Sequence, residues 1–268
     1  MTSGGTILDT IISRKHAEVA AASSRRSLKA VQAMAEEQEP PRDFYKGLLN
    51  VAAHRPAVIA ECKKQSPSAG IIRLPYDPVA IASSYERAGA AAISVLTDSE
   101  FFGGSLDDLV KVKGAVSIPV LRKDFIVAPY QIYEARAAGA DTVLLIAGVL
   151  DLAQLQYFIE ISRELGMEPL IETHNQDEVE IARGTDAMIL GVNCRNLKTF
   201  RVDLEHLKHT AAALSAERSN RLLVAESGIK VPDDIEQLAA IGYKAFLVGE
   251  TLLRSPDCGH ALHELIRR

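Results

Sequence analysis

The sequence predicts an α/β fold, a closed (β/α)8 barrel preceded by an N-terminal helical extension. Eight short apolar runs alternate with longer amphipathic segments rich in Ala, Glu and Leu, which is the pattern of parallel strands joined by helices. The runs cover residues 57–60, 91–96, 118–121, 142–146, 168–171, 187–192, 221–225 and 245–248. At 268 residues, the chain is long enough for one TIM barrel of about 250 residues. We therefore expect a single domain over 1–268, with the extension in 1–50 and the barrel in 51–268.

The extension is predicted from helical periodicity without any strand-like run. Apolar pairs at 7–8 and 11–12 recur at helical spacing among charged residues. Pro40 and Pro41 end this helical stretch, because proline lacks a backbone donor and disfavours helix in the residue before it. We expect the extension either to pack as a cap on the barrel or to help close a site.

The spacing of three glycines supports the barrel. Gly89, Gly139 and Gly242 each close an amphipathic segment just before an apolar run. They lie 50 and 103 residues apart, which corresponds to two and four repeats of about 25 residues if they end helices one, three and seven. An open doubly wound sheet is the alternative, but no G-x-G-x-x-G follows the first run.

Composition excludes several classes of partner. A net charge of -5 gives no overall attraction to nucleic acid or to an anionic membrane surface, so we expect neither as a partner. The chain has no apolar run of about 18 residues and a polar N-terminus, which predicts a cytoplasmic protein. Its three cysteines are widely spaced and its histidines form no cluster, so neither a disulfide framework nor a metal site is expected.

Polar residues follow most of the apolar runs, at the strand ends where such barrels place their active sites. Because side chains alternate along a strand, Glu61 and Lys63 share one face. By the same rule, Lys123 lies on the face of Leu121 inside the barrel, whereas Arg122 points outward. Each residue alone is explained by a solvated ion pair or a structural carboxylate. Together they indicate an active site, with these strand-end candidates: Glu61, Lys63, Lys123, Glu172, Asn193, Arg195, Glu226, Ser227 and Glu250.

Two further features suggest what such a site binds. Gly228 and Gly249 follow strands seven and eight and bring free backbone N–H groups to the start of a helical turn, the usual phosphate position of these barrels. Helix capping explains either glycine alone, whereas their joint position favours phosphate. Phe101 and Phe102, after strand two, form either a wall for an aromatic substrate or a packed loop.

The motifs taken together resemble the indole-3-glycerol phosphate synthase family of tryptophan biosynthesis. The resemblance covers the chain from about residue 5 to its end. One departure is Gln65, where many members carry lysine or a small residue. The motifs are Glu61-x-Lys63 with Ser66-Pro67-Ser68, Phe102-Gly103-Gly104-Ser105, Lys123-Asp124-Phe125, Glu172-x-His174, Asn193-x-Arg195 and Glu226-Ser227-Gly228.

The resemblance implies closure of 1-(2-carboxyphenylamino)-1-deoxyribulose 5-phosphate to an indole, with loss of carbon dioxide and water. It implies that Lys123 is the general acid, that Glu172 supports the cationic intermediate, and that Glu61 and Lys63 serve dehydration. The remaining implied positions are catalytic at Asn193 and Ser227 and substrate-binding at Ser66, Phe102, Phe125, Arg195, Glu226, Gly228, Gly249 and Glu250. The iminium intermediate is itself the electron sink, so no cofactor and no metal is expected. A monomer is expected, with weak self-association as the alternative.

A lysine is a suitable acid if burial and nearby cations, here Lys63 and Arg195, lower its pKa towards about 7 to 8. The competing functions are another phosphate-binding barrel enzyme, such as a sugar-phosphate isomerase, and a catalytically silent barrel that binds sugar phosphates or a protein.

Overall fold

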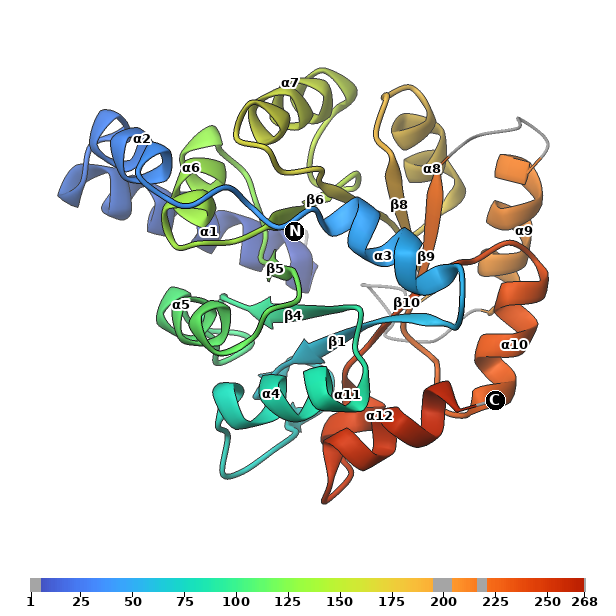
Figure 1. Ribbon diagram of the computed structural model, residues 1–268. Coiled ribbons are helices and arrows are strands. Elements are labelled where there is room, and N and C mark those ends of the chain that lie inside the picture. Colours follow the sequence, from blue (N-terminus) through green and yellow to red (C-terminus); the bar gives the residue numbers. More distant parts are fainter. Residues whose placement is uncertain (1–5, 195–203, 216–220, 268) are drawn as a thin grey trace, which may run out of the picture.

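Eight parallel strands form a closed barrel in the computed structural model, which describes residues 6–194, 204–215 and 221–267 (Figure 1). Strand β1 pairs with both β4 and β10, which closes the ring. The strands are β1 (Ala57–Cys62), β4 (Ala92–Leu96), β5 (Val120–Lys123), β6 (Thr142–Ile146), β7 (Leu170–Thr173), β8 (Ile189–Asn193), β9 (Leu222–Glu226) and β10 (Ala245–Val248). Each strand falls on one of the eight apolar runs, so the predicted (β/α)8 barrel is confirmed.

Helices between the strands surround the barrel (Figure 1). They are α4 (Pro78–Ala88), α5 (Leu106–Ala115), α6 (Pro129–Ala137), α7 (Leu152–Glu164), α8 (Gln176–Arg183), α9 (Leu204–Ser215), α10 (Pro232–Ala240), α11 (Glu250–Leu253) and α12 (Cys258–Ile266). Gly89, Gly139 and Gly242 follow α4, α6 and α10 with φ of 98°, 89° and 111°. These helices follow strands one, three and seven of the barrel, so the predicted spacing is confirmed.

Strand side chains divide the core into two layers. Inward residues such as Ile59, Leu121 and Leu144 fill the barrel interior. Outward residues, Cys62 and Cys194 among them, pack in the layer between strands and helices. Arg122 also points outward, because its guanidinium donates to the backbone oxygen of Gln131 on α6 at 2.9 Å. The alternation rule therefore assigned the faces of β5 correctly.

The N-terminal extension consists of three helices, α1 (Ile7–Arg25), α2 (Leu28–Glu36) and α3 (Phe44–Ala52). Helix α3 lies at the strand starts, where Phe44 and Leu48 are buried in the barrel interior layer. Helix α1 lies at the opposite end, where its apolar residues Ile7, Leu8 and Ile11 line a cavity. The extension thus packs as a cap at one end of the barrel and contributes to a cavity at the other.

The turn predicted after β1 contains a short antiparallel hairpin, β2 (Gln65–Ser66) and β3 (Gly70–Ile71). No helix in the described part of the chain has the length and apolarity needed to cross a lipid bilayer.

Two glycines give opposite expectations for stability. A Cβ at Gly104 would collide with the backbone oxygen of Leu96, whereas a Cβ at the exposed Gly114 in α5 would meet nothing within 4 Å. We expect Gly114→Ala to raise the free energy of unfolding by about 0.5 to 1 kcal/mol through helix propensity. Gly104→Ala should lower it by about 1 to 3 kcal/mol through overpacking. Urea unfolding of both variants checks this, and equal effects at the two positions would contradict it.

Candidate active site

A cavity of about 700 Å³ opens at the C-terminal ends of the strands. Its lining combines residues that are far apart in the sequence and that strand closure brings together. The predicted site residues on its wall are Glu61, Lys63, Ser66, Phe102, Lys123, Phe125, Glu172, Asn193, Glu226, Ser227, Gly228, Gly249 and Glu250. Arg195 lies outside the described residues.

Lys123, at the end of β5, is the central cation of this cavity. Its Nζ donates to Glu172 Oε2 on β7 at 2.6 Å and lies 3.6 Å from Glu226 Oε2 on β9. Burial alone would lower the pKa of Lys123, but the carboxylates of Glu172, Glu226 and Glu61 outweigh burial and raise that pKa well above its ordinary value. The prediction of a lowered pKa was therefore wrong, because acids from other strands face the lysine.

The pKa values of Glu172 and Glu226 are shifted in opposite directions. Burial would raise the pKa of Glu172, but Lys123 and His174 outweigh it and hold that pKa well below the usual range. Burial and the neighbouring Glu172 raise the pKa of Glu226 well above its usual value. A pair of carboxyl groups with separated pKa values can hold one proton between them. The carboxyl of Glu226 is accommodated because Gly191 on β8 has no side chain, where a Cβ would collide with Glu226.

His174 is a site residue that the sequence argument treated as uninformative. Its Nε2 lies 2.8 Å from Glu172 Oε1, and its Nδ1 lies 3.1 Å from Glu178 Oε2 on α8. Burial would lower the pKa of His174, but hydrogen bonds to Glu172 and Glu178 outweigh it and raise that pKa to about 9. The sequence contains this information, because Glu172 and His174 are two residues apart at a strand end and such residues share a face.

Asn193 and Ser227 extend the network from Glu172 to β9. Asn193 Nδ2 donates to Glu172 Oε1 at 3.2 Å, and Ser227 Oγ donates to Asn193 Oδ1 at 2.8 Å. Ser227 has a φ of 69° and the following Gly228 a φ of 76°. Positive φ costs a non-glycine residue conformational energy, and it is retained here where the serine side chain meets the cavity.

Glu61 and Lys63, on the inner face at the end of β1, form an ion pair. Their location confirms the prediction that both side chains share a face. A Cβ at Gly249 would collide with the carboxylate of Glu61. Gly249 therefore leaves room for Glu61, in addition to exposing its own backbone to the cavity.

The end of the cavity next to β9 and β10 is rich in cations. Lys230 and Arg254 line it beside Gly228 and Gly249. The side chain of Glu250 accepts from Arg254 at 2.8 Å, one turn along the chain. This end can therefore bind an anion through backbone N–H groups and two positive charges.

A family model described as "Indole-3-glycerol phosphate synthase" matches residues 8–265. The chain belongs to the indole-3-glycerol phosphate synthase family. It is 48% identical to indole-3-glycerol phosphate synthase of Albidiferax ferrireducens, over 97% of this chain and 97% of that protein. It is 47% identical to the protein of that name from Desulfotalea psychrophila, over 97% of this chain and 98% of the other. Membership in the synthase family removes the isomerase alternative.

Solved structures show the same fold at low identity. Tryptophan synthase subunit alpha from Legionella pneumophila matches with a TM-score of 0.61 and 15% sequence identity. The match covers 84% of this chain and 97% of that one. The N-acetylmannosamine-6-phosphate 2-epimerase from Clostridium perfringens gives a TM-score of 0.59 at 12% identity, over 80% of this chain and 93% of that one. At this identity the likeness shows the barrel alone.

The contacts of His174 predict a pH-dependent stability of the synthase. Its pKa of about 9 in the folded protein exceeds the ordinary value of 6.5. Its contribution is therefore complete below pH 6.5 and is lost as the pH rises through 9, a change of about 3 kcal/mol in the free energy of unfolding. We expect His174→Gln to flatten this decline in urea unfolding between pH 6 and pH 9. His263→Gln, an exposed histidine on α12, is the control, and parallel declines in all three proteins would contradict the prediction.

The cationic end of the cavity predicts which lysine supports anion binding. We expect Lys230→Met to weaken binding of glycerol 3-phosphate about three- to tenfold, which corresponds to roughly 1 kcal/mol for an exposed charge. Lys244→Met removes another exposed lysine, just before β10 at the opposite end of the barrel, and should leave the affinity unchanged. Calorimetry at low salt checks both variants, and equal affinities for Lys230→Met and wild type would place the anion elsewhere.

Proposed function

We propose that this chain acts as an indole-3-glycerol phosphate synthase in which Lys123 donates the proton for ring closure. The match to the family supports the reaction. The observation that carries the residue assignment is the ammonium of Lys123, held between Glu172 and Glu226 on the cavity wall. The substrate is then 1-(2-carboxyphenylamino)-1-deoxyribulose 5-phosphate, a sugar phosphate with an anthranilate group.

Ring closure joins the aromatic carbon that carries the carboxylate to the ketone carbon of the sugar chain. As that bond forms, the ketone oxygen becomes an alkoxide, and the nitrogen donates its lone pair so that an iminium cation develops. An alkoxide is a far stronger base than an amine, so it takes a proton from Lys123 even though carboxylates raise the pKa of the lysine. The raised pKa keeps Lys123 in its acid form before the substrate enters.

The carboxyl groups then act on the charges that remain. Ionised Glu172 stabilises the iminium cation, which develops only during the reaction. Carbon dioxide leaves when the electrons of its bond to the ring neutralise the iminium, so the substrate itself is the electron sink and the proposal uses no metal or cofactor. The raised pKa of Glu226, whose carboxyl lies 3.6 Å from Lys123 Nζ, makes it the carboxylate of the cluster that takes up a proton most readily.

Dehydration completes the indole. Lys63 supplies the proton that allows the hydroxyl to leave as water, and Glu61 takes the proton from the adjacent carbon. Their ion pair at the end of β1 supports this division of work. Asn193 and Ser227, which are hydrogen-bonded to each other, orient Glu172 and complete the catalytic set.

The two ends of the substrate differ in chemistry, as do the two ends of the cavity. Phe102 and Phe125, with ring centroids 6.0 Å apart, form the aromatic half. The opposite half, with cations and exposed backbone, holds the phosphate. The proposed substrate-binding residues are Ser66, Phe102, Phe125, Arg195, Glu226, Gly228, Gly249 and Glu250.

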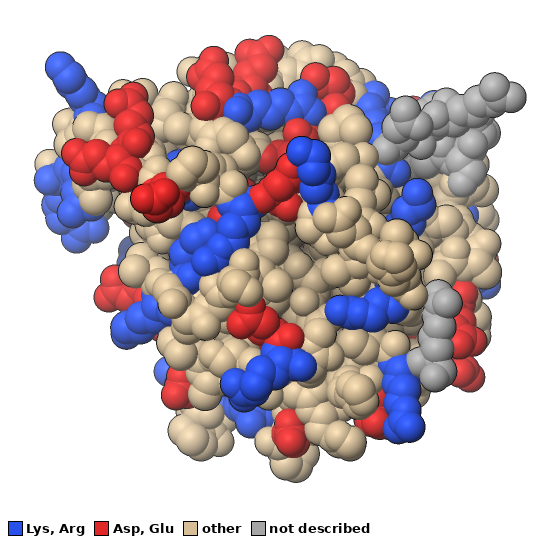
Figure 2. Space-filling view, viewed as in Figure 1, with Lys and Arg blue, Asp and Glu red and all other residues tan. Residues whose placement is uncertain are grey.

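We also propose one domain over residues 1–268, a cytoplasmic location, and a monomer that binds no nucleic acid. Extension helices that pack at both ends of the barrel support the single domain. Three free, buried cysteines suit a reducing compartment. Described residues of one chain line the cavity. On the face seen in Figure 2, acidic and basic side chains are interspersed, without the single-sign patch that nucleic acid would require.

The activity has a direct test. Purified protein incubated with the carboxyphenylamino-deoxyribulose phosphate should develop indole fluorescence and release carbon dioxide. Absence of both from folded protein would contradict the proposed function.

If Lys123 is the general acid, a variant that keeps its positive charge but cannot give up a proton should lose activity. Lys123→Arg keeps a cation between the two carboxylates, but a guanidinium does not give up its proton in proteins. We expect this variant to keep its fold and its affinity for product while kcat falls about 10²- to 10⁴-fold. Lys123→Met should in addition lose stability, because it leaves buried carboxylates without their cation. Steady-state kinetics and urea unfolding check this, and near-normal kcat in Lys123→Arg would leave Lys123 with an electrostatic role alone.

A further inference from the structure

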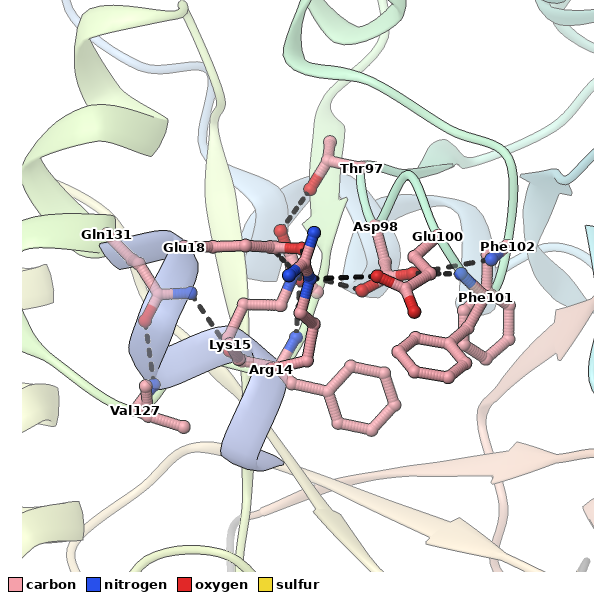
Figure 3. Close-up of polar contacts among 12 residues, drawn as sticks. Arg14, Lys15, Glu18, Thr97, Asp98, Glu100, Phe101, Phe102, Val127 and Gln131 are labelled. Carbon is pink, nitrogen blue, oxygen red and sulfur yellow. Dashed lines mark hydrogen bonds and ion pairs between the residues drawn. The ribbon is translucent and has the colours of Figure 1, made fainter. Parts of the chain in front are cut away.

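Lys15, on helix α1, is a buried cation that the proposed reaction does not use. Its side chain is only 4% exposed, and three carboxylates surround its Nζ, those of Glu18 and Asp98 being labelled in Figure 3. The nitrogen lies 2.8 Å from Glu18 on the same helix, 2.9 Å from Asp98 and 3.0 Å from Asp124. Asp98 follows β4 and Asp124 follows β5, so one lysine joins the ends of two adjacent strands.

Asp98 determines the conformation of the loop that carries Phe102. Its Oδ1 accepts the backbone N–H groups of Phe101 at 2.8 Å and Phe102 at 3.3 Å (Figure 3). Its other oxygen faces Lys15. The side chain of Asp98 is fully buried. In the described part of the chain, Lys15 is the cation paired with Asp98.

Asp124 has the corresponding role on the neighbouring strand. Its Oδ1 faces Lys15 and accepts the backbone N–H of Phe125 at 2.8 Å. Its Oδ2 accepts from Thr97 Oγ at 2.6 Å and from Arg122 at 3.0 Å. Asp124 therefore keeps a charged partner without Lys15, whereas Asp98 depends on it.

We propose that Lys15 is a positioning residue for the aromatic half of the active site. Its charge neutralises Asp98 and Asp124 together, and each of these carboxylates fixes the backbone of one of the two facing phenylalanines. Without that charge, Asp98 becomes an uncompensated buried anion, and the loop must move to expose it to water. The separation of Phe102 and Phe125 then changes, and with it the slot for the aromatic ring. The inference rests on the proposed function, which supplies that ring.

A matched control lies next to Lys15 on the same helix. Arg14 pairs with Glu100, in the same loop as Phe102, at 2.8 Å, but both side chains are about half exposed. If anchoring α1 to this loop by charge were sufficient, Arg14→Met and Lys15→Met would act alike. Because an exposed pair contributes little, we expect Arg14→Met to be nearly silent.

The test compares two ligands that share a phosphate and differ in the aromatic group. Binding of indole-3-glycerol phosphate and of glycerol 3-phosphate to the full-length chain is measured by calorimetry. We expect Lys15→Met to weaken indole-3-glycerol phosphate about tenfold or more and glycerol 3-phosphate less than about twofold, with Arg14→Met within about twofold for both. Equal weakening of both ligands, or an unchanged affinity for the indole ligand, would overturn the proposal.

A double variant separates neutralisation from helix anchoring. Asp98→Asn keeps an acceptor for the two loop N–H groups but removes the charge. Lys15→Met/Asp98→Asn should therefore bind indole-3-glycerol phosphate within about threefold of wild type, although it lacks the ion pair. A double variant as weak as Lys15→Met would show that the pair only attaches α1. This comparison decides the question even if Lys15→Met alone fails to fold.

Failure of the proposed function has a different signature. A wild-type chain that neither binds indole-3-glycerol phosphate nor forms it would contradict the function itself. A wild-type chain that does both, with Lys15→Met unaffected, would contradict only the role of Lys15.

Discussion

Closure of the barrel places the ammonium of Lys123 among carboxylates that come from three other strands, and the site depends on this contact. Glu61, Glu172 and Glu226 each end a different strand, and their summed charge outweighs the cost of burying the lysine. The same lysine allows Glu172 to remain ionised in a buried position. Removing any one of these groups therefore shifts the pKa values of the others. The reactivity of the site belongs to the cluster rather than to a single residue.

The sequence predicted the frame of this cluster because the frame follows local rules. Apolar runs gave the eight strands, and alternation along a strand placed Glu61 with Lys63 and Lys123 with Leu121. Glycines at helix ends gave the repeat. Each of these features depends on residues that are close in the chain, so one sequence is enough to recognise it.

The contacts between strands could not be predicted in the same way. The pKa of Lys123 was expected to fall through burial and nearby cations, yet Glu172 lies 2.6 Å from its Nζ. One partner of His174, Glu178, lies on helix α8, so the strand pattern did not reveal this contact. Lys15 and Asp98 are far apart in sequence, and nothing near either residue indicates the pair. Tertiary ion pairs depend on the register between elements, which a periodic pattern does not contain. Arg195 lies outside the described residues, so its role in substrate binding stays a prediction.

The N-terminal extension both packs on the barrel and adds contacts between residues that are far apart in the sequence. Its third helix packs at the strand starts, and its first helix carries Lys15 to the strand ends, where Asp98 and Asp124 lie.

The most direct test of the proposed site is the protonation of Lys123 itself, followed by ¹⁵N NMR of its side chain in the free protein. The account predicts that the ammonium stays protonated beyond pH 10.5, the ordinary lysine value, and that Glu172→Gln brings its titration to lower pH. An amine that titrates near neutral pH in the wild-type protein would contradict the account.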